Sequence, residues 1–210
     1  MQIKKFQNII FDLGGVILNI DEHKTIIEFA RLSQQTPEEI IATMKLPEHQ
    51  MVLQHYEMGK INTGQFRQQL SAFAKVQVAD KAFDKAWNMV LMDIPLERIK
   101  LLKRLKTTHR IFLLSNTNDL HWQHFNQILA ETSQLQNFDE LFEKTYYSFQ
   151  LGCRKPDKAI YQHVLQDNNL NPAKTIMFDD LQENLDGAES AGIHTFTIER
   201  NQLPLEIFYE

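Results

Sequence analysis

The sequence predicts an α/β fold, in which a doubly wound and mostly parallel sheet carries an all-helical insertion after its first strand. Two observations predict it. From Pro95 onward, short apolar runs typical of buried strands alternate with segments whose apolar residues recur at helical spacing. Residues 21–94 instead show helical spacing and no convincing strand. Because strands that alternate with helices are joined by right-handed crossovers, the chain outside the insertion is expected to form one mostly parallel sheet.

The first strand is predicted near the N-terminus, where a short apolar run ends in a sharp turn. Phe6 and residues 9–11 are apolar, Asp12 follows them, and the turn-prone pair Gly14-Gly15 comes next. A short apolar run that ends at such a turn is typical of a buried strand. The turn places Asp12 at the carboxyl end of that strand.

Residues 21–94 contain about five predicted helices. Thr36 and Glu39 have the spacing of a capping box, with Pro37 at the first helical position, which indicates a helix start. Gly59 is typical of a helix end, and the loop after it leads to a new cap.

After the insertion, helices and strands alternate toward the end of the chain. A helix through Leu101 and Leu105 comes first. The remaining expected elements are strands at 111–114, 145–148, 175–178 and 195–198, and helices at 118–131, 157–169 and 182–191. This order divides the chain into a core domain of residues 1–20 and 95–210 and a helical domain of residues 21–94.

Composition restricts the class of protein. The apolar content of 43% supports a hydrophobic core, and 22 basic against 27 acidic residues leave a net charge of −5. This balance argues against a chain built to neutralise nucleic-acid phosphates. Cys153 is the single cysteine, so no internal disulfide can form. No apolar run approaches the roughly 20 residues that span a bilayer, and Asp12 interrupts the apolar stretch that a signal peptide needs. We expect a cytoplasmic protein without a nucleic-acid or membrane partner.

Four polar clusters fall at or near the carboxyl ends of the expected strands, where ligands collect in open α/β sheets. The clusters are Asp12, Ser115-Asn116, Arg154-Lys155 and Asp179-Asp180. Any one of them can be explained as a turn former or a helix cap. Together they bring a carboxylate, a hydroxyl, a cation and a second carboxylate pair to one loop region.

Those groups suit phosphoryl transfer. A carboxylate can attack phosphorus to give an aspartyl-phosphate, which splits the reaction into two steps. Carboxylates that face each other repel unless a divalent cation lies between them, and oxygen-only ligands favour Mg²⁺. The same ion would neutralise charge as it develops. The hydroxyl, backbone amides and the ammonium would hold the remaining phosphoryl oxygens.

The polar clusters resemble the motifs of the haloacid dehalogenase-like hydrolases. The matching segments are Phe11-Asp12-Leu13-Gly14-Gly15-Val16, Leu114-Ser115-Asn116-Thr117, Arg154-Lys155-Pro156-Asp157 and Phe178-Asp179-Asp180. Their order and spacing cover nearly the whole chain, and the insertion lies where the family's type 1 cap belongs. The resemblance implies a Rossmann-like core with a helical cap. Within the family, the chain is most similar to small bacterial phosphatases of sugar phosphates, including alpha-D-glucose 1-phosphate, which share a Leu-Ser-Asn-Thr-Asn segment.

The resemblance implies a magnesium-dependent phosphatase that acts through an aspartyl-phosphate on a small phosphorylated metabolite, with a sugar 1-phosphate favoured. Asp12 would be the nucleophile and a magnesium ligand. Ser115 and Lys155 would be catalytic and bind the phosphoryl group, with Asn116 beside them.

Gly14 and the acidic pair complete the implied site. Asp179 and Asp180 would bind the metal, and the sequence leaves open which of them contacts the ion directly. The backbone of Gly14 would reach the metal and the phosphoryl group. Most family phosphatases have a second Asp at this position as general acid and base, a group worth roughly 10²–10⁴ in rate. Its absence is a departure from the family's general pattern, although the most similar sugar-phosphate phosphatases share it.

Two alternatives stay open beside the phosphatase. One is a non-catalytic or weakly active binding protein that kept the fold, and the other is a different hydrolase chemistry such as carbon–halogen cleavage. Asn184 can orient the acidic pair or cap its helix. His121 or Asp21 can supply the missing proton, and Arg154 can be a surface charge or a ligand.

Overall fold

The computed structural model describes residues 3–209 and confirms the predicted fold class. Five strands form one sheet in the order β3-β2-β1-β4-β5, and every neighbouring pair is parallel. The strands are β1 (Asn8–Phe11), β2 (Arg110–Ser115), β3 (Lys144–Tyr147), β4 (Thr175–Asp179) and β5 (His194–Thr197). Since β1 lies at the centre with β2 and β4 on either side, the carboxyl ends of these three strands meet at one edge.

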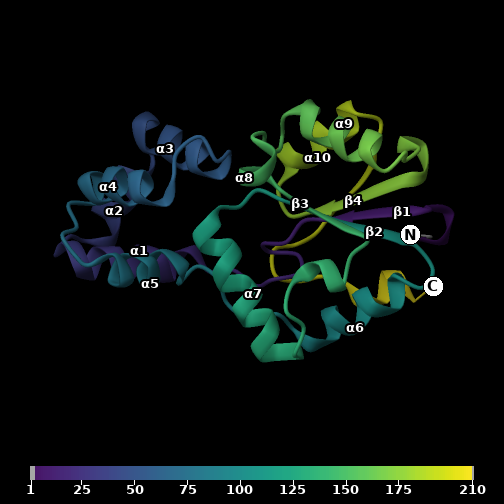
Figure 1. The fold of residues 1–210 in the computed structure, drawn as a ribbon, viewed down its shortest axis with the longest axis horizontal. Coiled ribbons are helices and arrows are strands. Elements are labelled where there is room, and N and C mark those ends of the chain that lie inside the picture. The colour runs from purple at the N-terminus through teal and green to yellow at the C-terminus, as the bar shows by residue number, and fades with distance from the viewer. Residues whose placement is uncertain (1–2, 210) are drawn as a thin grey trace.

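Helices cover both faces of the sheet (Figure 1). On one face lie α6 (Leu96–Leu105), α7 (Asp119–Ser133) and the C-terminal segment, and on the other lie α9 (Lys158–Asp167) and α10 (Gln182–Ser190). The alternation of side chains along a strand explains this layering, because Phe11 packs into the first layer and Ile10 into the second. Both side chains are fully buried. The short helix α8 (Ser148–Leu151) follows β3.

The insertion after β1 is helical, as predicted. It contains α1 (Glu22–Ser33), α2 (Pro37–Met44), α3 (Pro47–Glu57), α4 (Thr63–Ala74) and α5 (Asp80–Asn88). The capping box expected at Thr36 and Glu39 is present, with Thr36 Oγ1 accepting from the Glu39 backbone N–H. These helices bury a core of their own around Phe66 and Phe83, separate from the two layers of the sheet. Figure 1 shows the insertion as a lobe beside the carboxyl edge of the sheet.

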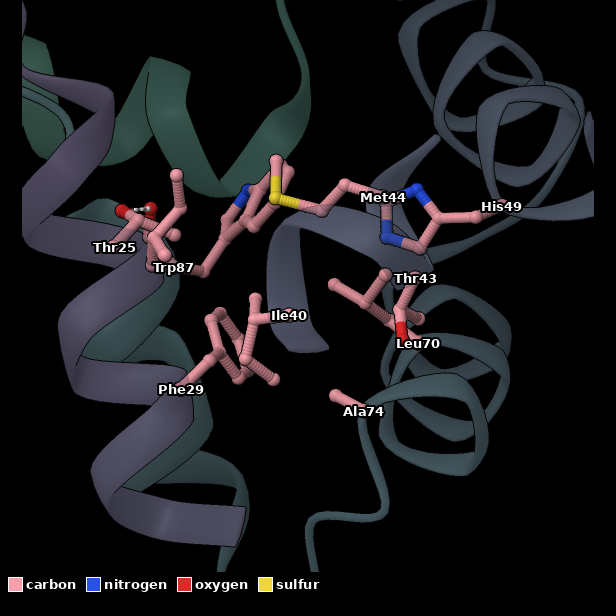
Figure 2. Close-up of a pocket in the computed structure, with 10 residues that line it drawn as sticks. Thr25, Phe29, Ile40, Thr43, Met44, His49, Leu70, Ala74 and Trp87 are labelled. Carbon is pink, nitrogen blue, oxygen red and sulfur yellow. Dashed lines mark hydrogen bonds between the residues drawn. The ribbon is translucent and has the colours of Figure 1, made fainter. Parts of the chain in front are cut away.

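A small cavity lies inside this lobe, among α1 to α5 (Figure 2). Its volume is about 20 Å³, and mostly apolar side chains such as Phe29, Ile40 and Leu70 line it. His49 Nδ1 borders the same region as a buried nitrogen without a hydrogen-bond partner among the described residues. Such a volume holds about one water molecule and no metabolite.

Element boundaries depart from the sequence-based expectation by one or two residues. Helix α7 begins at Asp119 because Asn118 is its N-cap, and its side chain accepts from the backbone N–H of His121. Helix α9 ends at Asp167, and Asn169 then turns the chain with a φ of 54°. Within residues 3–209, the structure contains no helix that is long and apolar enough to cross a bilayer.

Candidate active site

The carboxyl ends of β1, β2 and β4 bring the predicted polar clusters together. Asp12 directly follows β1, Ser115 ends β2 and Asp179 ends β4. Lys155 enters from the loop between α8 and α9. All four residues are buried, so the cluster lies inside the protein and not on its outer surface.

Lys155 joins two carboxylates at the centre of the cluster. Its Nζ donates to Asp12 Oδ1 at 2.6 Å and to Asp179 Oδ2 at 2.7 Å, and the residue is only 1% exposed. Burial alone would lower the pKa of this ammonium, but the two carboxylates raise it above its ordinary value. The two carboxylates therefore favour the charged form of Lys155.

Asp12 is the carboxylate whose protonation the site changes most clearly. Burial raises its pKa to about 7, while the charge of Lys155 acts in the opposite direction and Asp179 adds to the rise. Its Oδ1 accepts from Lys155, and its Oδ2 has no hydrogen-bond partner among residues 3–209. One oxygen of Asp12 is thus fixed and the other is available to an incoming group.

Asp179 is held from several sides. Its Oδ1 accepts from the backbone N–H of Leu181 at 2.9 Å and from Asn184 Nδ2 at 3.0 Å. Its Oδ2 accepts from Lys155 and, at 3.1 Å, again from Asn184. Asn184 thus orients Asp179 from within α10 and is not the cap of that helix, because Leu181 occupies the N-cap.

Asp180 has a different set of partners. Its Oδ2 accepts from Arg200 Nε at 2.6 Å, and Arg200 Nη1 also reaches Glu22 Oε1 at 3.0 Å at the start of α1. Burial raises the pKa of Asp180, and Arg200 opposes the rise. Gly15 packs closely against Asp180. Its φ is 77°, and a Cβ at this position would lie 2.7 Å from Asp180 Oδ2.

Three carboxylates can hold a metal ion together. One oxygen from each of Asp12, Asp179 and Asp180 lies within 4.8 Å of the others. An all-oxygen set with several charges suits Mg²⁺, which keeps several waters and binds through one or two carboxylates. The buried Asn184 Oδ1 also lacks a hydrogen-bond partner among the described residues, so it is free to accept a hydrogen bond from a water bound to the metal. The donor set fits Mg²⁺.

The side chain of Asn116 makes a contact that the sequence did not indicate. Its Nδ2 donates to the Lys155 backbone oxygen at 2.9 Å, and its Oδ1 accepts from the Lys155 backbone N–H at 2.9 Å. The side chain therefore clamps the loop that carries Lys155. Contact of Asn116 with a phosphoryl group would have to come from its backbone.

Gly14, Ser115 and Asn116 share a cavity of about 160 Å³ with His121. His121 is partly buried, and its burial lowers its pKa to about 4. Its ring stacks on Trp87 with centroids 5.0 Å apart, and its nitrogens lie 3.3 Å from Trp87 O and 3.2 Å from Asn118 Nδ2. Both ring nitrogens are thus engaged and the ring is neutral. Asp21, the other suggested proton donor, is the N-cap of α1.

Sequence reasoning did not identify Arg200 and Glu57 as residues near the site. Arg200 follows β5 outside every motif, and Glu57 reaches Arg154 from the end of α3. The position of Arg200 just after a strand was a weak signal. No local signal marks Glu57, because only the docking of the insertion brings it to this loop.

Comparison with known proteins places this geometry in context. The family model described as haloacid dehalogenase-like hydrolase matches residues 6–192. The D-ribitol-5-phosphate phosphatase of Bacteroides thetaiotaomicron is 29% identical over 194 residues, which cover 90% of each chain.

Solved structures of enzymes from the same family are similar to this chain over nearly its whole length. A crystal structure of a HAD family enzyme from Bacteroides thetaiotaomicron superimposes with a TM-score of 0.89 at 32% identity, covering 98% of this chain and 99% of that one. A complex of the wild-type form with magnesium and inorganic phosphate has a TM-score of 0.86 at 30% identity, with 97% and 99% covered. The L-2-haloacid dehalogenase of Xanthobacter autotrophicus, at 16% identity, a TM-score of 0.61 and coverage of 92% and 77%, shares the fold alone.

Proposed function

Because the chain belongs to the haloacid dehalogenase-like hydrolases and is a phosphatase of that family, we propose that it hydrolyses the phosphate ester of a small sugar or sugar alcohol. The observation that carries the proposal is the buried contact of Lys155 with both Asp12 and Asp179 at the carboxyl edge of the sheet. This contact holds Asp12 in place while its second oxygen stays available. A carboxylate prepared in this way is a nucleophile for phosphorus.

Each residue of the cluster has a role in the proposed reaction. Asp12 attacks the phosphorus, the ester P–O bond breaks, and the alkoxide leaves and takes a proton from solvent. Water then attacks the phosphorus of the aspartyl-phosphate, which releases inorganic phosphate and regenerates the Asp12 carboxylate. Lys155 and the hydroxyl of Ser115 hold phosphoryl oxygens during both steps. Asn116 keeps Lys155 in position through its two bonds to the Lys155 backbone.

Magnesium belongs to the same proposal. Asp12, Asp179 and Asp180 would hold the ion, with the backbone of Gly14 as a further ligand. When bound, the ion supplies neutralisation of phosphoryl charge. Asp179 already accepts bonds on both oxygens, whereas Asp180 Oδ1 has no partner among the described residues. This difference favours Asp180 over Asp179 as a direct ligand.

Two observations favour different esters within the proposed class. The absence of an acid at Gly14 favours a sugar 1-phosphate, because an anomeric hydroxyl leaves more easily than an ordinary alcohol. The related phosphatase from Bacteroides thetaiotaomicron acts on D-ribitol 5-phosphate, an ester of a primary alcohol. Both substrates are small and carry several hydroxyl groups, and this shared chemistry defines the proposed class.

We also propose that residues 1–20 and 95–210 act as the core domain and residues 21–94 as the cap. The substrate would bind between them, where Gly14 and Ser115 of the core share a cavity with Val90 and Leu91 at the end of the insertion. Enclosure by the cap would exclude bulk water from the reacting phosphoryl group.

Phosphate release tests the proposed function. The wild-type protein is incubated with p-nitrophenyl phosphate, alpha-D-glucose 1-phosphate and D-ribitol 5-phosphate, each with Mg²⁺ and with EDTA. We expect Mg²⁺-dependent release that the Asp12→Asn variant lacks. Absence of release from every ester, together with retained phosphate binding, would support the binding protein instead. Chloride release from a 2-chloro acid without phosphate release would support dehalogenation.

A further inference from the structure

The carboxylates that can hold the metal ion each have an oxygen that is already engaged. Asp12 Oδ1 accepts from Lys155 Nζ, and Asp180 Oδ2 accepts from Arg200 Nε at 2.6 Å. Both oxygens of Asp179 accept hydrogen bonds. Within the described part of the chain, Asp12 Oδ2 and Asp180 Oδ1 are left without a hydrogen-bond partner. The cluster therefore offers one free oxygen from Asp12 and one from Asp180.

Arg200 reaches Asp180 at a buried position. The Asp180 side chain is 3% exposed, whereas 40% of the Arg200 side chain is exposed. A second nitrogen of Arg200, Nη1, donates to Glu22 Oε1 at 3.0 Å. The guanidinium thus enters the site through Nε and is also held by Glu22 at the start of α1.

Hydrogen bonds of the loop after β5 fix the backbone that carries Arg200. The N–H of Asn201, the next residue, donates to the carbonyl oxygen of Gly15 at 2.7 Å. The Asn201 side chain bonds to both the N–H and the carbonyl oxygen of Ile20, each at 2.9 Å. Arg98 Nη2 donates to the carbonyl oxygen of Asn201 at 2.6 Å. The position of the Arg200 backbone is therefore fixed relative to the site.

Gly15 packs against the same oxygen of Asp180 that Arg200 engages. A Cβ at Gly15 would lie 2.7 Å from Asp180 Oδ2 and 3.2 Å from Arg200 Cγ. The Gly15 backbone and the Arg200 side chain thus both border this oxygen. An ion that used Oδ2 as well as Oδ1 would have to compete with Arg200 for it.

Divalent cations differ in how they use a carboxylate. Mg²⁺ is small and demands a nearly octahedral set of ligands at about 2.0–2.1 Å. The two oxygens of one carboxylate lie too close together to occupy neighbouring corners of such an octahedron, so Mg²⁺ takes one of them. Ca²⁺ accepts about six to eight oxygens in a flexible geometry and binds carboxylates through one oxygen or both. A carboxylate with one engaged oxygen therefore suits Mg²⁺ better than Ca²⁺.

We propose that Arg200 gives the metal site a preference for Mg²⁺ over Ca²⁺ by keeping Asp180 Oδ2 out of the coordination sphere. Asp180 then binds through Oδ1 alone. Loss of the Arg200 donor frees Oδ2, and Asp180 can bind Ca²⁺ through both oxygens. This inference rests on the metal site of the proposed function and deepens it, because it makes a residue outside the acidic cluster responsible for the choice of ion.

Titrations of the melting temperature with Mg²⁺ and with Ca²⁺ at pH 8 give the apparent Kd of each ion without any substrate. The measured quantity is the ratio of the Kd for Ca²⁺ to the Kd for Mg²⁺, which should be well above one in wild type. Arg200→Met keeps an unbranched side chain and removes the donor. Partners that orient metal ligands change metal affinity by about 10- to 100-fold, so the ratio should fall by about tenfold or more.

Arg200→Gln separates the hydrogen bond from the charge. The Nε2 of glutamine is as many bonds from the backbone as the Nε of arginine, so this variant can donate to Asp180 Oδ2 without a charge. A change of charge beside the site acts in the same direction on both dications and nearly cancels in the ratio. We therefore expect Arg200→Gln to keep the wild-type ratio even where the two Kd values shift together.

Three further variants control the measurement. Asp180→Asn should bind both ions more weakly, because it replaces a charged ligand by a neutral one. Arg110→Met applies the same substitution to an exposed ion pair with Glu143 at the start of β2, so both Kd values should stay unchanged. Arg200→Ala also lacks the donor and replaces Arg200→Met if that variant does not fold.

The outcomes separate this inference from the proposed function. A ratio near one in wild type, or an unchanged ratio in Arg200→Met that still binds Mg²⁺, would overturn the inference and leave the phosphatase standing. An equal fall of the ratio in Arg200→Met and Arg200→Gln would assign the effect to charge and overturn it too. Wild-type affinity for both ions in Asp180→Asn would remove Asp180 as a ligand, with the same consequence. Stabilisation by neither ion would overturn the metal site itself, and phosphate release decides separately whether the protein is a phosphatase.

Discussion

The ammonium of Lys155 donates a hydrogen bond to the carboxylate of Asp12 at 2.6 Å, in a site that is buried from solvent. The same ammonium is bonded to Asp179, so one cation serves two acids. This arrangement offsets the cost of burying Asp12, but only in part, because burial still raises the pKa of that carboxyl to about 7. The resulting excess of negative charge above neutral pH is what a metal ion would relieve.

Asp12→Asn should abolish turnover while keeping the fold. An amide cannot attack phosphorus, so we expect kcat for p-nitrophenyl phosphate to fall by about three orders of magnitude or more. In EDTA at pH 8, the variant should melt at or above the wild-type temperature, because it avoids an ionised carboxyl that burial disfavours.

Asp186→Asn is the matched control for this variant. Asp186 is exposed on α10 and bonds to Gln182, so its loss should leave kcat near the wild-type value. Retention of a tenth of wild-type activity by Asp12→Asn would show that another residue is the nucleophile.

Stabilisation by Mg²⁺ should grow with pH. The folded pKa of Asp12 lies near 7 and above the reference value of 3.8, so the metal-free protein loses stability as pH rises from about 4 to 7, and the full cost is present above 7. Mg²⁺ needs the ionised carboxylate and competes with its proton. At pH 6 the apparent affinity should be about tenfold lower than at pH 8.

Melting temperatures with millimolar Mg²⁺ and with EDTA at pH 6, 7 and 8 measure this dependence. Asp12→Asn should show a smaller rise with Mg²⁺ and little change with pH. A rise that is equal at pH 6 and pH 8 in wild type would contradict a shared site at Asp12.

Asn184→Leu should weaken both stability and metal binding. The Asn184 side chain donates to both oxygens of buried Asp179. Leucine has a similar size but no N–H group, so the Asp179 carboxylate loses these two hydrogen bonds. Loss of such a bond costs about 1–3 kcal/mol of unfolding free energy. Because Asp179 then loses its orientation, a titration of the melting temperature should show weaker Mg²⁺ binding.

Gln182→Leu on the same helix is the comparison. Gln182 is exposed and bonds to Asp186, so its replacement should change the unfolding free energy by no more than about 0.5 kcal/mol. Equal stability and equal Mg²⁺ affinity in Asn184→Leu and wild type would mean that Asp179 needs no support from Asn184.

Local patterns predicted the elements of the fold well, because each depends on short-range physics. The capping box at Thr36 and the apolar run of β1 are local features, and the structure has both. The parallel character of the sheet also followed from local signals, since strands that alternate with helices are joined by right-handed crossovers.

The partners of the site residues could not be predicted in the same way. Nothing in the sequence indicated that the Asn116 amide bonds to the backbone of Lys155, which is 39 residues away in the chain. Arg200 and Glu57 reach the site only through tertiary packing. Spacing along the sequence carries no information on such contacts.

The backbone and the space around Gly14 can accommodate a side chain. Gly14 is absent from the described residues with positive φ, and a Cβ there would meet Ile20 at 3.6 and 3.7 Å, which are ordinary contacts. Gly15 differs, because its φ of 77° and the short distance to Asp180 exclude a side chain. We therefore expect Gly14→Asp to fold, with Gly14→Asn as a matched variant that adds the same bulk without an acid.

Gly14→Asp should make the rate less sensitive to the leaving group. Phosphoryl transfer is largely dissociative, so charge builds on the departing oxygen as its bond breaks. Wild type lacks a carboxyl at Gly14, and His121 is neutral with a pKa of about 4 and both ring nitrogens engaged, so the alcohol leaves with little protonation. Single-turnover rates for a series of aryl and alkyl phosphates should then fall steeply as the leaving-group pKa rises. In Gly14→Asp an acid protonates that oxygen and the slope should become shallower, whereas Gly14→Asn should keep the steep slope. A slope near zero in wild type would show that a residue other than His121 already donates the proton, with Asp21 at the start of α1 as the next position to replace.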